Sequence, residues 1–434
     1  MGDESADRGF IRSFFTTPTA VQDDESAKML RKAVQLRGME APDVWVPDNE
    51  DATAPSMRDE GVENILEVVS EGGAEFPGQI HPRIVWHRDD PATRRQGYEH
   101  MLRIADPDEG AIQHIDGFVV PEVGSLDDWK KADEFITIVE NEHGLEEGSL
   151  AMSPIIESGE AELATERIDQ EIGKRSNNLE RLFLLVDGQV DYTKDMGAMT
   201  PTGAQPEWKE LRHNTSRAAS ANDLNAVDGP FDNIRDVAGY RDRMVDNWAM
   251  GMLGIWSLTP GQVVEANTAP LPSEVGTYLL TVDGDTVEFD RRSADTYVYE
   301  GDRVSLEELG DDRYALALGR EEAELDADDL HQTLLDETQY VMSMRDYVDS
   351  MEEFEAAKES GRGAISLTRT ATLVIDGVEV TVSRDRMWDE ATYQAARTPI
   401  ALFQEVYDAR PDQREALEER YGADLVERAL QLGH

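Results

Sequence analysis

Short runs of β-branched and aromatic residues recur from the start of the chain to about residue 270, with helically spaced apolar residues between them. This alternation is typical of βα units that build a parallel sheet. The runs expected to form strands are Arg12–Thr17, Val44–Pro47, Ile80–Trp86, Gly117–Pro121, Leu150–Ile156, Arg181–Val186, Ala226–Gly229 and Leu253–Leu258. Eight strands in about 250 residues are typical of a TIM barrel, a (β/α)8 fold of the α/β class. A doubly wound open sheet is the alternative.

The pattern changes near residue 270. Residues 1–270 are the predicted TIM-barrel catalytic domain. Residues 271–336 contain alternating apolar positions and Asp-Gly turns, as in Leu280–Val287, which predicts a small antiparallel β insertion. No spacing of the EF-hand type is present, so its aspartates indicate a solvated hairpin and not a calcium site.

Residues 337–434 are the predicted C-terminal domain, which is mostly helical. A helix is expected over Tyr340–Lys358. A hairpin turning at Asp376-Gly377 follows, and then two helices interrupted near Arg410-Pro411.

Helix boundaries have signals of their own. Ser125 and Asp128 resemble a capping box before an apolar helical spacing, and Gly144 is placed as the C-terminal stop. Asp90-Pro91 and Thr259-Pro260 put proline where the first turn of a helix tolerates it.

The charge of the chain is strongly acidic. It has 91 acidic and 41 basic residues, a formal net charge of -50, and only eight lysines. Acidic residues spread over the whole length indicate adaptation to molar salt, which screens their mutual repulsion. No basic stripe is present to meet phosphates, so nucleic-acid binding is not expected. An interaction protein for basic partners is the alternative that this composition leaves open.

The chain has no cysteine, which excludes disulfides, thiolate metal sites and cysteine nucleophiles. No apolar run approaches the roughly 20 residues of a membrane span, and the first residues are acidic and polar. We therefore expect a cytoplasmic protein with no membrane partner.

Candidate reactive groups lie at the predicted strand ends, where a TIM barrel places its chemistry. Asp48, Glu50 and Asp51 follow the second run, Glu157 follows the fifth, and Arg83 lies within the third. The sixth run leads into a loop that contains Asp187, Asp191 and Asp195. Carboxylates from separate strands that face one volume need a hard cation between them, and Mg²⁺ takes one or two protein carboxylates.

Each of these residues also has a purely structural interpretation. Glu157 could be a helix cap or a rim ion pair, Arg83 a structural counter-ion, and the acids after the second run ordinary helix-start residues. The sequence has no Walker loop, dinucleotide fingerprint, Gly-x-Ser-x-Gly elbow or His-Glu-x-x-His motif.

At these positions the chain resembles the superfamily of the citrate lyase β-subunit and malyl-CoA lyase, and most closely the malate synthases of halophilic archaea. The resemblance covers about residues 10 to 270. The matching segments are Arg12–Pro18, Asp48–Ala52, Arg83, Glu157, Gly188–Gly197, Ala226–Pro230 and Gly254–Pro260. In that register Asp191, and neither Asp187 nor Asp195, is the second metal ligand beside Glu157. Thr259 stands where the lyases usually have histidine, which argues against a lyase.

In the C-terminal domain, Met387–Thr392 is similar to the malate synthase segment whose aspartate is the catalytic base. The resemblance therefore implies that Asp389 is the base. An alternative is that Asp389 only caps the following helix, although both roles are compatible.

The resemblance implies an enzyme that condenses acetyl-CoA with glyoxylate and hydrolyses the thioester to malate and CoA. Mg²⁺ would be held by Glu157 and Asp191. Arg83, oriented by Asp48 or Glu50, would stabilise the enolate oxygen. The residues expected to bind substrate or CoA are Arg83, Trp256, Pro260 and Asp228.

Two other functions are carried forward. One is a malyl-CoA or methylmalyl-CoA lyase that leaves the thioester intact. The other is an acidic interaction protein that has kept the barrel but lost catalysis. Members of the superfamily also suggest a homo-oligomer, either a trimer or a hexamer.

Overall fold

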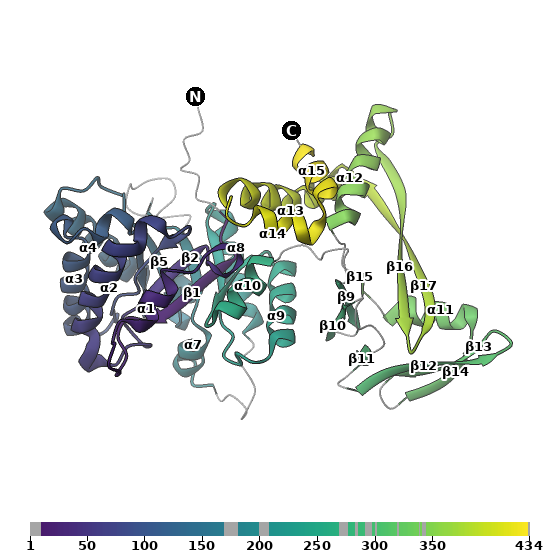
Figure 1. Cartoon of the computed structure of the whole chain (residues 1–434), viewed down its shortest axis with the longest axis horizontal. Helices are drawn as coiled ribbons and strands as arrows, with labels where there is room; N and C mark the ends of the chain where they lie inside the picture. Colours follow the sequence, from purple (N-terminus) through teal and green to yellow (C-terminus); the bar gives the residue numbers. More distant parts are fainter. Residues whose placement is uncertain are drawn as a thin grey trace. The chain divides into compact units, whose positions relative to one another are not determined.

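The computed structural model describes residues 10–168, 181–198, 208–268, 277–282, 285–290, 297–299, 302–318, 321–337, 339–340 and 344–432. The chain separates into two compact units, Met1–Thr268 and Ala269–His434 (Figure 1). The further division at residue 336 stays a prediction. Each unit is described by itself.

The first unit contains eight parallel strands. Their bounds are β1 Ser13–Pro18, β2 Val44–Asp48, β3 Gln79–Ile80, β4 Gly117–Val120, β5 Ala151–Ile156, β6 Leu184–Asp187, β7 Asn225–Pro230 and β8 Gly254–Ser257. Their order is β3-β2-β1-β8-β7-β6-β5-β4. Arg83 forms parallel bridges with both Asp48 and Val119, and the Val119 N–H donates to Pro82 O at 3.0 Å. These contacts join the two ends of the sheet, so the predicted TIM barrel is confirmed and the open sheet is excluded.

The third strand is much shorter than the apolar run Ile80–Trp86 predicted. Only Gln79–Ile80 is regular strand. Pro82 explains the difference because proline has no N–H to donate to a strand ladder. The chain continues alongside its neighbours through single contacts such as the Arg83 bridges.

Helices surround the strands and follow them in sequence. Their bounds are α1 Lys28–Ala33, α2 Arg58–Gly72, α3 Pro91–Ile104, α4 Leu126–His143, α5 Gly159–Thr165, α7 Gln189–Asp195, α8 Lys209–Ala221, α9 Val237–Ala249 and α10 Pro260–Thr268. The prolines at the starts of α3 and α10 stand where they were predicted, and Asp90 caps α3 through the Ala92 N–H. Ser125 is the N-cap of α4, but its hydroxyl makes no cap bond and lies 3.4 Å from the Asp128 carboxylate.

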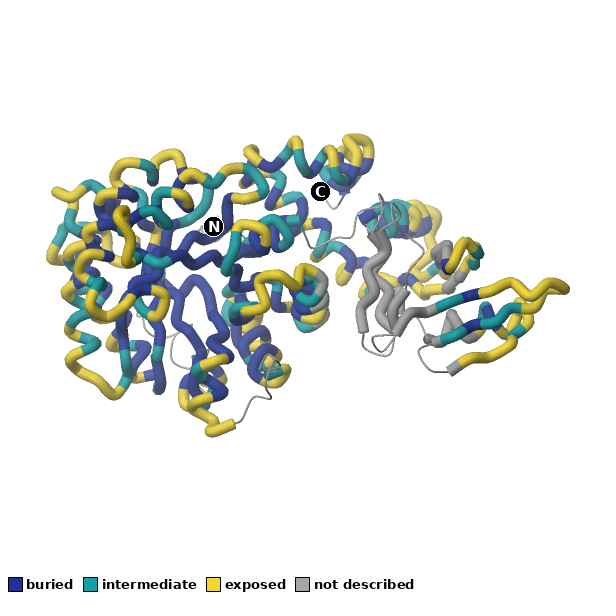
Figure 2. Tube along the Cα trace, turned by 60° about the horizontal axis from the view of Figure 1, so that its bottom comes forward, coloured by how far each residue is buried: buried dark blue, intermediate teal, exposed yellow. Residues whose placement is uncertain are grey.

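Adjacent strand residues bury opposite faces, which produces two apolar layers. Phe14 and Ile155 pack inside the barrel, whereas their neighbours Phe15 and Ile156 pack outward. Figure 2 shows the strands as buried chain surrounded by helices with exposed outer surfaces. Burying each of these large side chains contributes about 1.5–3 kcal/mol to the stability of the fold. The polar residues that follow the strands lie at the rim of the barrel.

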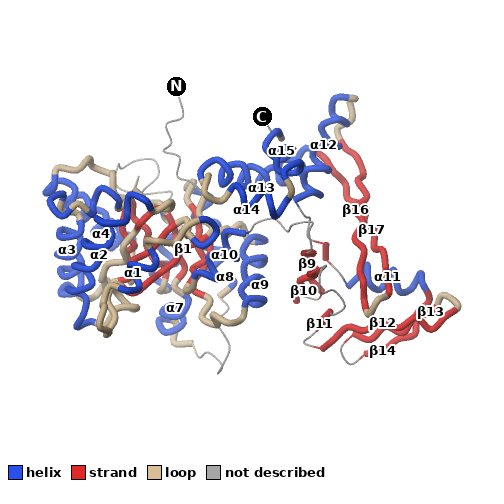
Figure 3. The backbone as a smooth tube through the Cα atoms, viewed as in Figure 1, coloured by secondary structure: helices blue, strands red, loops and turns tan. Residues whose placement is uncertain are grey.

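The second unit combines small antiparallel sheets with helices (Figure 3). Its bounds are β9 Thr277–Val282, β10 Asp285–Asp290, β11 Tyr297–Tyr299, β12 Asp302–Gly310, β13 Arg313–Leu318, β14 Glu321–Asp326, α11 Ala327–Glu337, β15 Gln339–Tyr340, α12 Met344–Glu359, β16 Ala364–Ile375, β17 Val378–Asp389, α13 Glu390–Ala409, α14 Arg414–Tyr421 and α15 Ala423–Gln431. The predicted β9–β10 pairing is confirmed, and its turn at 283–284 lies outside the described residues.

Three details of this unit differ from or refine the prediction. The helix expected from Tyr340 begins at Met344 as α12, and Tyr340 itself lies in β15. The hairpin turn at Asp376-Gly377 is confirmed, with φ of 48° and 82°, as a type I′ turn requires. Two helices were expected after it, but Gly422, with φ of 85°, separates α14 from α15.

Candidate functional site

Arg83 is the centre of a buried ion-pair cluster at the ends of β2 and β3. Its Nε donates to Asp48 Oδ1 at 2.8 Å, and its Nη2 donates to Asp48 Oδ2 at 2.5 Å. Its Nη1 lies 3.0 Å from Glu50 Oε2. The guanidinium also stacks over the Trp256 ring, 5.3 Å from the centroid. The structure therefore brings four predicted site residues together, and the bidentate contact fixes the plane of the guanidinium.

The charges of this cluster are strongly shifted. Burial opposes the charge of Arg83, but Asp48, Glu50 and Asp51 outweigh burial, so the pKa of Arg83 is raised. Burial raises the pKa of Glu50 to about 8, against the opposing attraction of Arg83. Arg83 is thus a permanent cation, and Glu50 retains its proton near neutral pH.

Glu157 follows β5 and is 4% exposed. Its Oε1 accepts a hydrogen bond from the backbone N–H of Glu122. Burial raises the pKa of Glu157 well above its ordinary value, and the nearby carboxylates of Glu122 and Asp191 raise it further, while Arg83 lowers it. A Cβ at Gly188 would lie 2.7 Å from Glu157 Oε2, so only glycine fits beside this carboxylate.

Asp191 lies in the first turn of α7, with its side chain 31% exposed. Lys194 Nζ is 3.2 Å from its Oδ1. Asp187 instead accepts from the Thr215 hydroxyl at 2.6 Å, and Asp195 accepts from Arg88 at 2.8 Å. The charge of Asp191 is among the main influences that raise the pKa of Glu157.

Asp228 lies in a separate, fully buried cluster at the end of β7. Its Oδ2 accepts from Arg243 Nε at 2.5 Å and from Asn247 Nδ2 at 2.8 Å. Its Oδ1 accepts from the side chain of Gln189 and from the Gly229 N–H. These internal donors engage both carboxylate oxygens, and none of them belongs to the Arg83 cluster.

Trp256 and Pro260 differ in their surroundings. Trp256 is buried inside the barrel, and its Nε1 donates to Thr16 Oγ1 at 2.9 Å. Pro260 is exposed at the first position of α10. Of the two, Trp256 is the one that contacts another predicted site residue, Arg83.

Asp389 ends β17 in the second unit and is exposed. Its Oδ1 accepts from the Thr392 N–H at 2.9 Å and from the Thr392 hydroxyl at 3.1 Å, so Asp389 caps α13. These hydrogen bonds lower the pKa of its carboxyl group. The structure thus confirms that Asp389 caps the helix. Its lowered pKa keeps the carboxyl group ionised at neutral pH.

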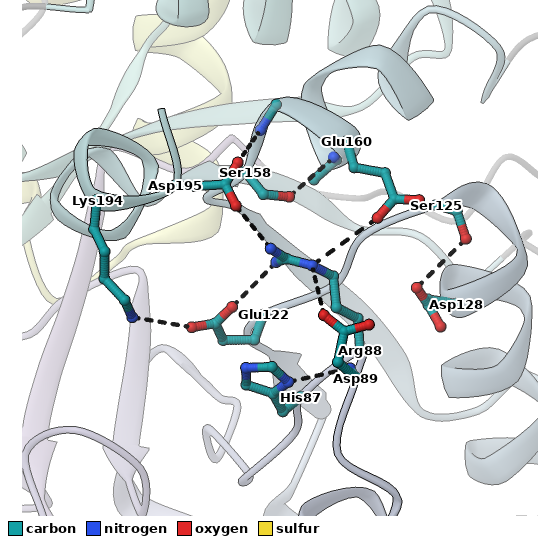
Figure 4. A network of polar contacts seen from close by, with 12 residues as sticks. His87, Arg88, Asp89, Glu122, Ser125, Asp128, Ser158, Glu160, Lys194 and Asp195 are labelled. Carbon is teal, nitrogen blue, oxygen red and sulfur yellow. Dashed lines mark hydrogen bonds and ion pairs between the residues drawn. The ribbon is translucent and has the colours of Figure 1, made fainter. Parts of the chain in front are cut away.

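Sequence reasoning missed Arg88 and Glu122. Figure 4 shows the Arg88 guanidinium among the side chains of Glu122, Glu160 and Asp195. Glu122 follows the fourth apolar run, which is the same signal that identified Glu157 after the fifth. Arg88 had no such signal, because nothing in the sequence marks a loop arginine as the centre of several contacts.

The residues present fit a magnesium ion. Glu157 is a buried carboxylate whose neighbours Glu122 and Asp191 are also acidic, and a cation bound between Glu157 and Asp191 would offset that repulsion. The described residues contain no group of three His, Asp or Glu side chains placed to hold a metal. Magnesium does not need one, because it binds through one or two carboxylates and completes its shell with water and substrate.

Comparisons with known proteins agree with this geometry. The HpcH/HpaI aldolase/citrate lyase model matches residues 87–260, and the malate synthase H C-terminal domain model matches residues 278–394. Malate synthase of Haloferax volcanii is 68% identical over 434 residues, covering 100% of both chains. Its structure as a pyruvate/acetyl-CoA ternary complex is 63% identical over 100% of both chains, with a TM-score of 0.61.

A second solved structure, a magnesium/glyoxylate complex of the Haloferax volcanii enzyme, is 60% identical and covers 98% of this chain and 99% of that chain, with a TM-score of 0.61. The family models and these relatives show that the chain is an enzyme of the aldolase and citrate lyase class. Within that class, the chain belongs to the haloarchaeal malate synthase family. No described helix combines the length and apolar character that crossing a membrane requires.

Proposed function

We propose that the chain condenses acetyl-CoA with glyoxylate in a Mg²⁺-dependent reaction and then hydrolyses the thioester, releasing malate and CoA. The observation that carries the proposal is the buried carboxylate of Glu157, whose pKa is influenced by the charges of both Asp191 and Arg83. The full-length similarity to malate synthase supports the same reaction.

The chemical task is to remove a proton from the methyl group of a thioester and to hold the resulting negative charge. Magnesium bound by Glu157 and Asp191 would supply a Lewis acid for the aldehyde and carboxylate oxygens of glyoxylate. Arg83 supplies a fixed positive charge for the enolate oxygen. Asp48 holds its plane through two hydrogen bonds, so the guanidinium needs little reorganisation during the reaction.

Asp389 takes the methyl proton as general base. Its contacts with Thr392 keep the carboxylate ionised and hold it in one rotamer at the start of α13. A lowered pKa makes a weaker base, so the reaction depends on Arg83 to stabilise the enolate as it forms.

The remaining roles extend the same proposal. Trp256 packs beneath Arg83 and with Pro260 contributes to acetyl-CoA binding. Asp228 acts indirectly, by holding the side chain of Gln189 next to Gly188. A trimer or hexamer in the cytoplasm is the expected form of the enzyme, and light scattering tests its mass.

An assay of released CoA tests the function. Acetyl-CoA and glyoxylate are incubated with the enzyme in molar salt, with and without Mg²⁺, and free CoA is followed with a thiol reagent. The chain has no cysteine, so the enzyme gives no background signal. We expect free CoA and malate only with Mg²⁺. Accumulation of malyl-CoA without free CoA would indicate a lyase, and no turnover would indicate a non-catalytic protein.

A further inference from the structure

Arg88 lies at the rim among the carboxylates of Glu122, Glu160 and Asp195, and it has no role in the reaction proposed above. Its Nη1 lies 3.2 Å from Glu122 Oε2 and its Nη2 lies 2.8 Å from Asp195 Oδ1. Its Nε is 3.9 Å from Glu160 Oε2. Glu122 follows β4, Glu160 follows β5 and Asp195 follows β6, while Arg88 itself follows β3. One guanidinium therefore connects the segments after four successive strands (Figure 4).

Two of those segments carry the proposed metal ligands. Glu157 precedes α5, which contains Glu160, and Asp191 lies one turn before Asp195 in α7. Asp195 Oδ2 also accepts from the Gly159 N–H at 3.0 Å, which connects α7 directly to the start of α5. Arg88 therefore contacts both of the segments that carry Glu157 and Asp191.

Glu122 provides a second connection from Arg88 to the site. It has φ of 47°, a left-handed conformation that costs a residue with a side chain about 1–2 kcal/mol. In this conformation its N–H donates to Glu157 Oε1. Arg88 holds Glu122 at two points, because the Arg88 N–H donates to Glu122 O at 3.1 Å and the guanidinium contacts the carboxylate.

The carboxylate of Glu122 is thereby directed to cations. Arg88 contacts Oε2, and Lys194 Nζ lies 3.9 Å from Oε1. Glu122 donates its backbone N–H to Glu157, and the negative charge of its side chain also acts on Glu157. Without Arg88, the strained backbone and the like charge would both favour a rearrangement that withdraws this N–H from Glu157.

We propose that Arg88 is a positioning residue for the metal site: by holding Glu122 and Asp195, it orients Glu157 and fixes its spacing from Asp191 for a divalent cation. The inference rests on the proposed function, because it assumes that Glu157 and Asp191 bind Mg²⁺. Lysine cannot replace Arg88, because a single ammonium group cannot reproduce the planar fork that contacts Glu122 and Asp195 together.

The test compares Mg²⁺ binding by the full-length metal-free chain with that of Arg88→Gln and Arg88→Lys, by calorimetric titration in molar salt. Removing an outer partner of a metal ligand typically weakens metal affinity 10–100-fold. We expect the Mg²⁺ Kd to rise at least ~10-fold in both variants. The KM for glyoxylate should rise in parallel, while the KM for acetyl-CoA changes less than about two-fold, since only glyoxylate is held through the metal.

Arg31 provides the matched control. It also contacts three carboxylates, those of Glu25, Glu67 and Glu71, but on the outer helices α1 and α2 and the segment before them. Arg31→Gln should leave the Mg²⁺ Kd and both KM values unchanged. Circular dichroism and the melting temperature without Mg²⁺ establish that each variant folds.

The outcomes separate this inference from the proposed function. Wild-type Mg²⁺ affinity in a folded Arg88→Lys or Arg88→Gln variant would overturn the role of Arg88 and leave the metal site intact. An equal rise in the KM for both substrates would also overturn it. Absence of saturable Mg²⁺ binding by the wild-type chain would overturn the metal site itself, and the role of Arg88 with it.

Discussion

Glu157 in the barrel and Asp389 in the C-terminal unit both stand at the end of a β-strand, but their surroundings shift their acidity in opposite directions. Glu157 is 4% exposed, and burial beside other acids raises its pKa. Asp389 is exposed, and hydrogen bonds from Thr392 lower its pKa. The buried group needs a cation to become charged, whereas the exposed group is already charged and available as a base. The role of an acidic residue therefore depends on the surroundings of its side chain and not on its position at the end of a strand.

The largest expected effect tests the exposed acid. Asp389→Asn should lower kcat by ~10²-fold or more, because a general base contributes about 10²–10⁴-fold. Asparagine is as good an N-cap as aspartate, so α13 and the melting temperature should be unchanged. Steady-state kinetics with a thermal melt measures both. Turnover like that of the wild type in this variant would leave Asp389 as a helix cap only.

The next effect concerns the buried acid. Glu157→Gln should raise the Mg²⁺ Kd by at least ~100-fold, because it removes a charged ligand and not only an outer partner. The metal-free variant should melt no lower than the wild type at neutral pH. A raised pKa means that the ionised carboxylate destabilises the folded state, and glutamine removes that charge.

Glu140→Gln is the matched control for that sign. Glu140 is equally buried, but its oxygens lie 2.9 Å and 3.0 Å from the guanidinium of Arg181. Asp133 still pairs with Arg181, but glutamine removes the charge from the two hydrogen bonds that Glu140 accepts, so this variant should melt lower. If Glu140→Gln and Glu157→Gln lowered the melting temperature equally, the expected difference between a buried glutamate with an arginine partner and one without would be wrong.

The barrel could be predicted from the sequence because its strands are buried on both faces. Such strands appear as continuous apolar runs, and polar residues such as Asp48 and Glu157 mark their ends. The third run was predicted too long as a strand, because an apolar pattern does not show that Pro82 lacks the N–H that a strand ladder needs. Arg83 lies beside Asp48 because of the register between their two chain segments, which the composition of the sequence does not reveal.

The rest of the site depends on conformations that sequence patterns do not encode. The left-handed backbone of Glu122 is unusual for a residue with a side chain, so no propensity predicts it. Arg88 acts through contacts up to 107 positions away along the chain, as with Asp195. Asp228 follows the same strand-end rule as Glu157, but Arg243 and Asn247 neutralise and enclose it.

Asp228 therefore gives a smaller test of the same contrast. Asp228→Asn should lower the free energy of unfolding by about 2 kcal/mol, because it removes the charge from hydrogen bonds to buried Arg243. Denaturant unfolding measures this change. The KM for acetyl-CoA should remain close to the wild-type value. A large rise in that KM without loss of stability would instead support the prediction that Asp228 binds substrate directly.

The last expected effect is a pH dependence of stability that comes from Glu50. Its pKa is raised to about 8 in the folded protein from an ordinary value of 4.5, chiefly by burial. The folded state therefore holds this proton more tightly than the unfolded state. The stabilisation is fully present below 4.5 and is lost as pH rises to about 8.

Glu50→Gln keeps a neutral side chain beside Arg83 at every pH and so removes that loss. The melting temperature of the variant relative to the wild type should rise by about 2 °C or more between acidic pH and a pH above the folded pKa. Glu99→Gln, which changes an exposed acid paired with Arg95 on α3, is the control and should follow the wild-type profile. A constant difference between Glu50→Gln and the wild type would show that Glu50 is ionised beside Arg83 throughout. Glu50 would then belong with Asp389 among the acids that are already charged.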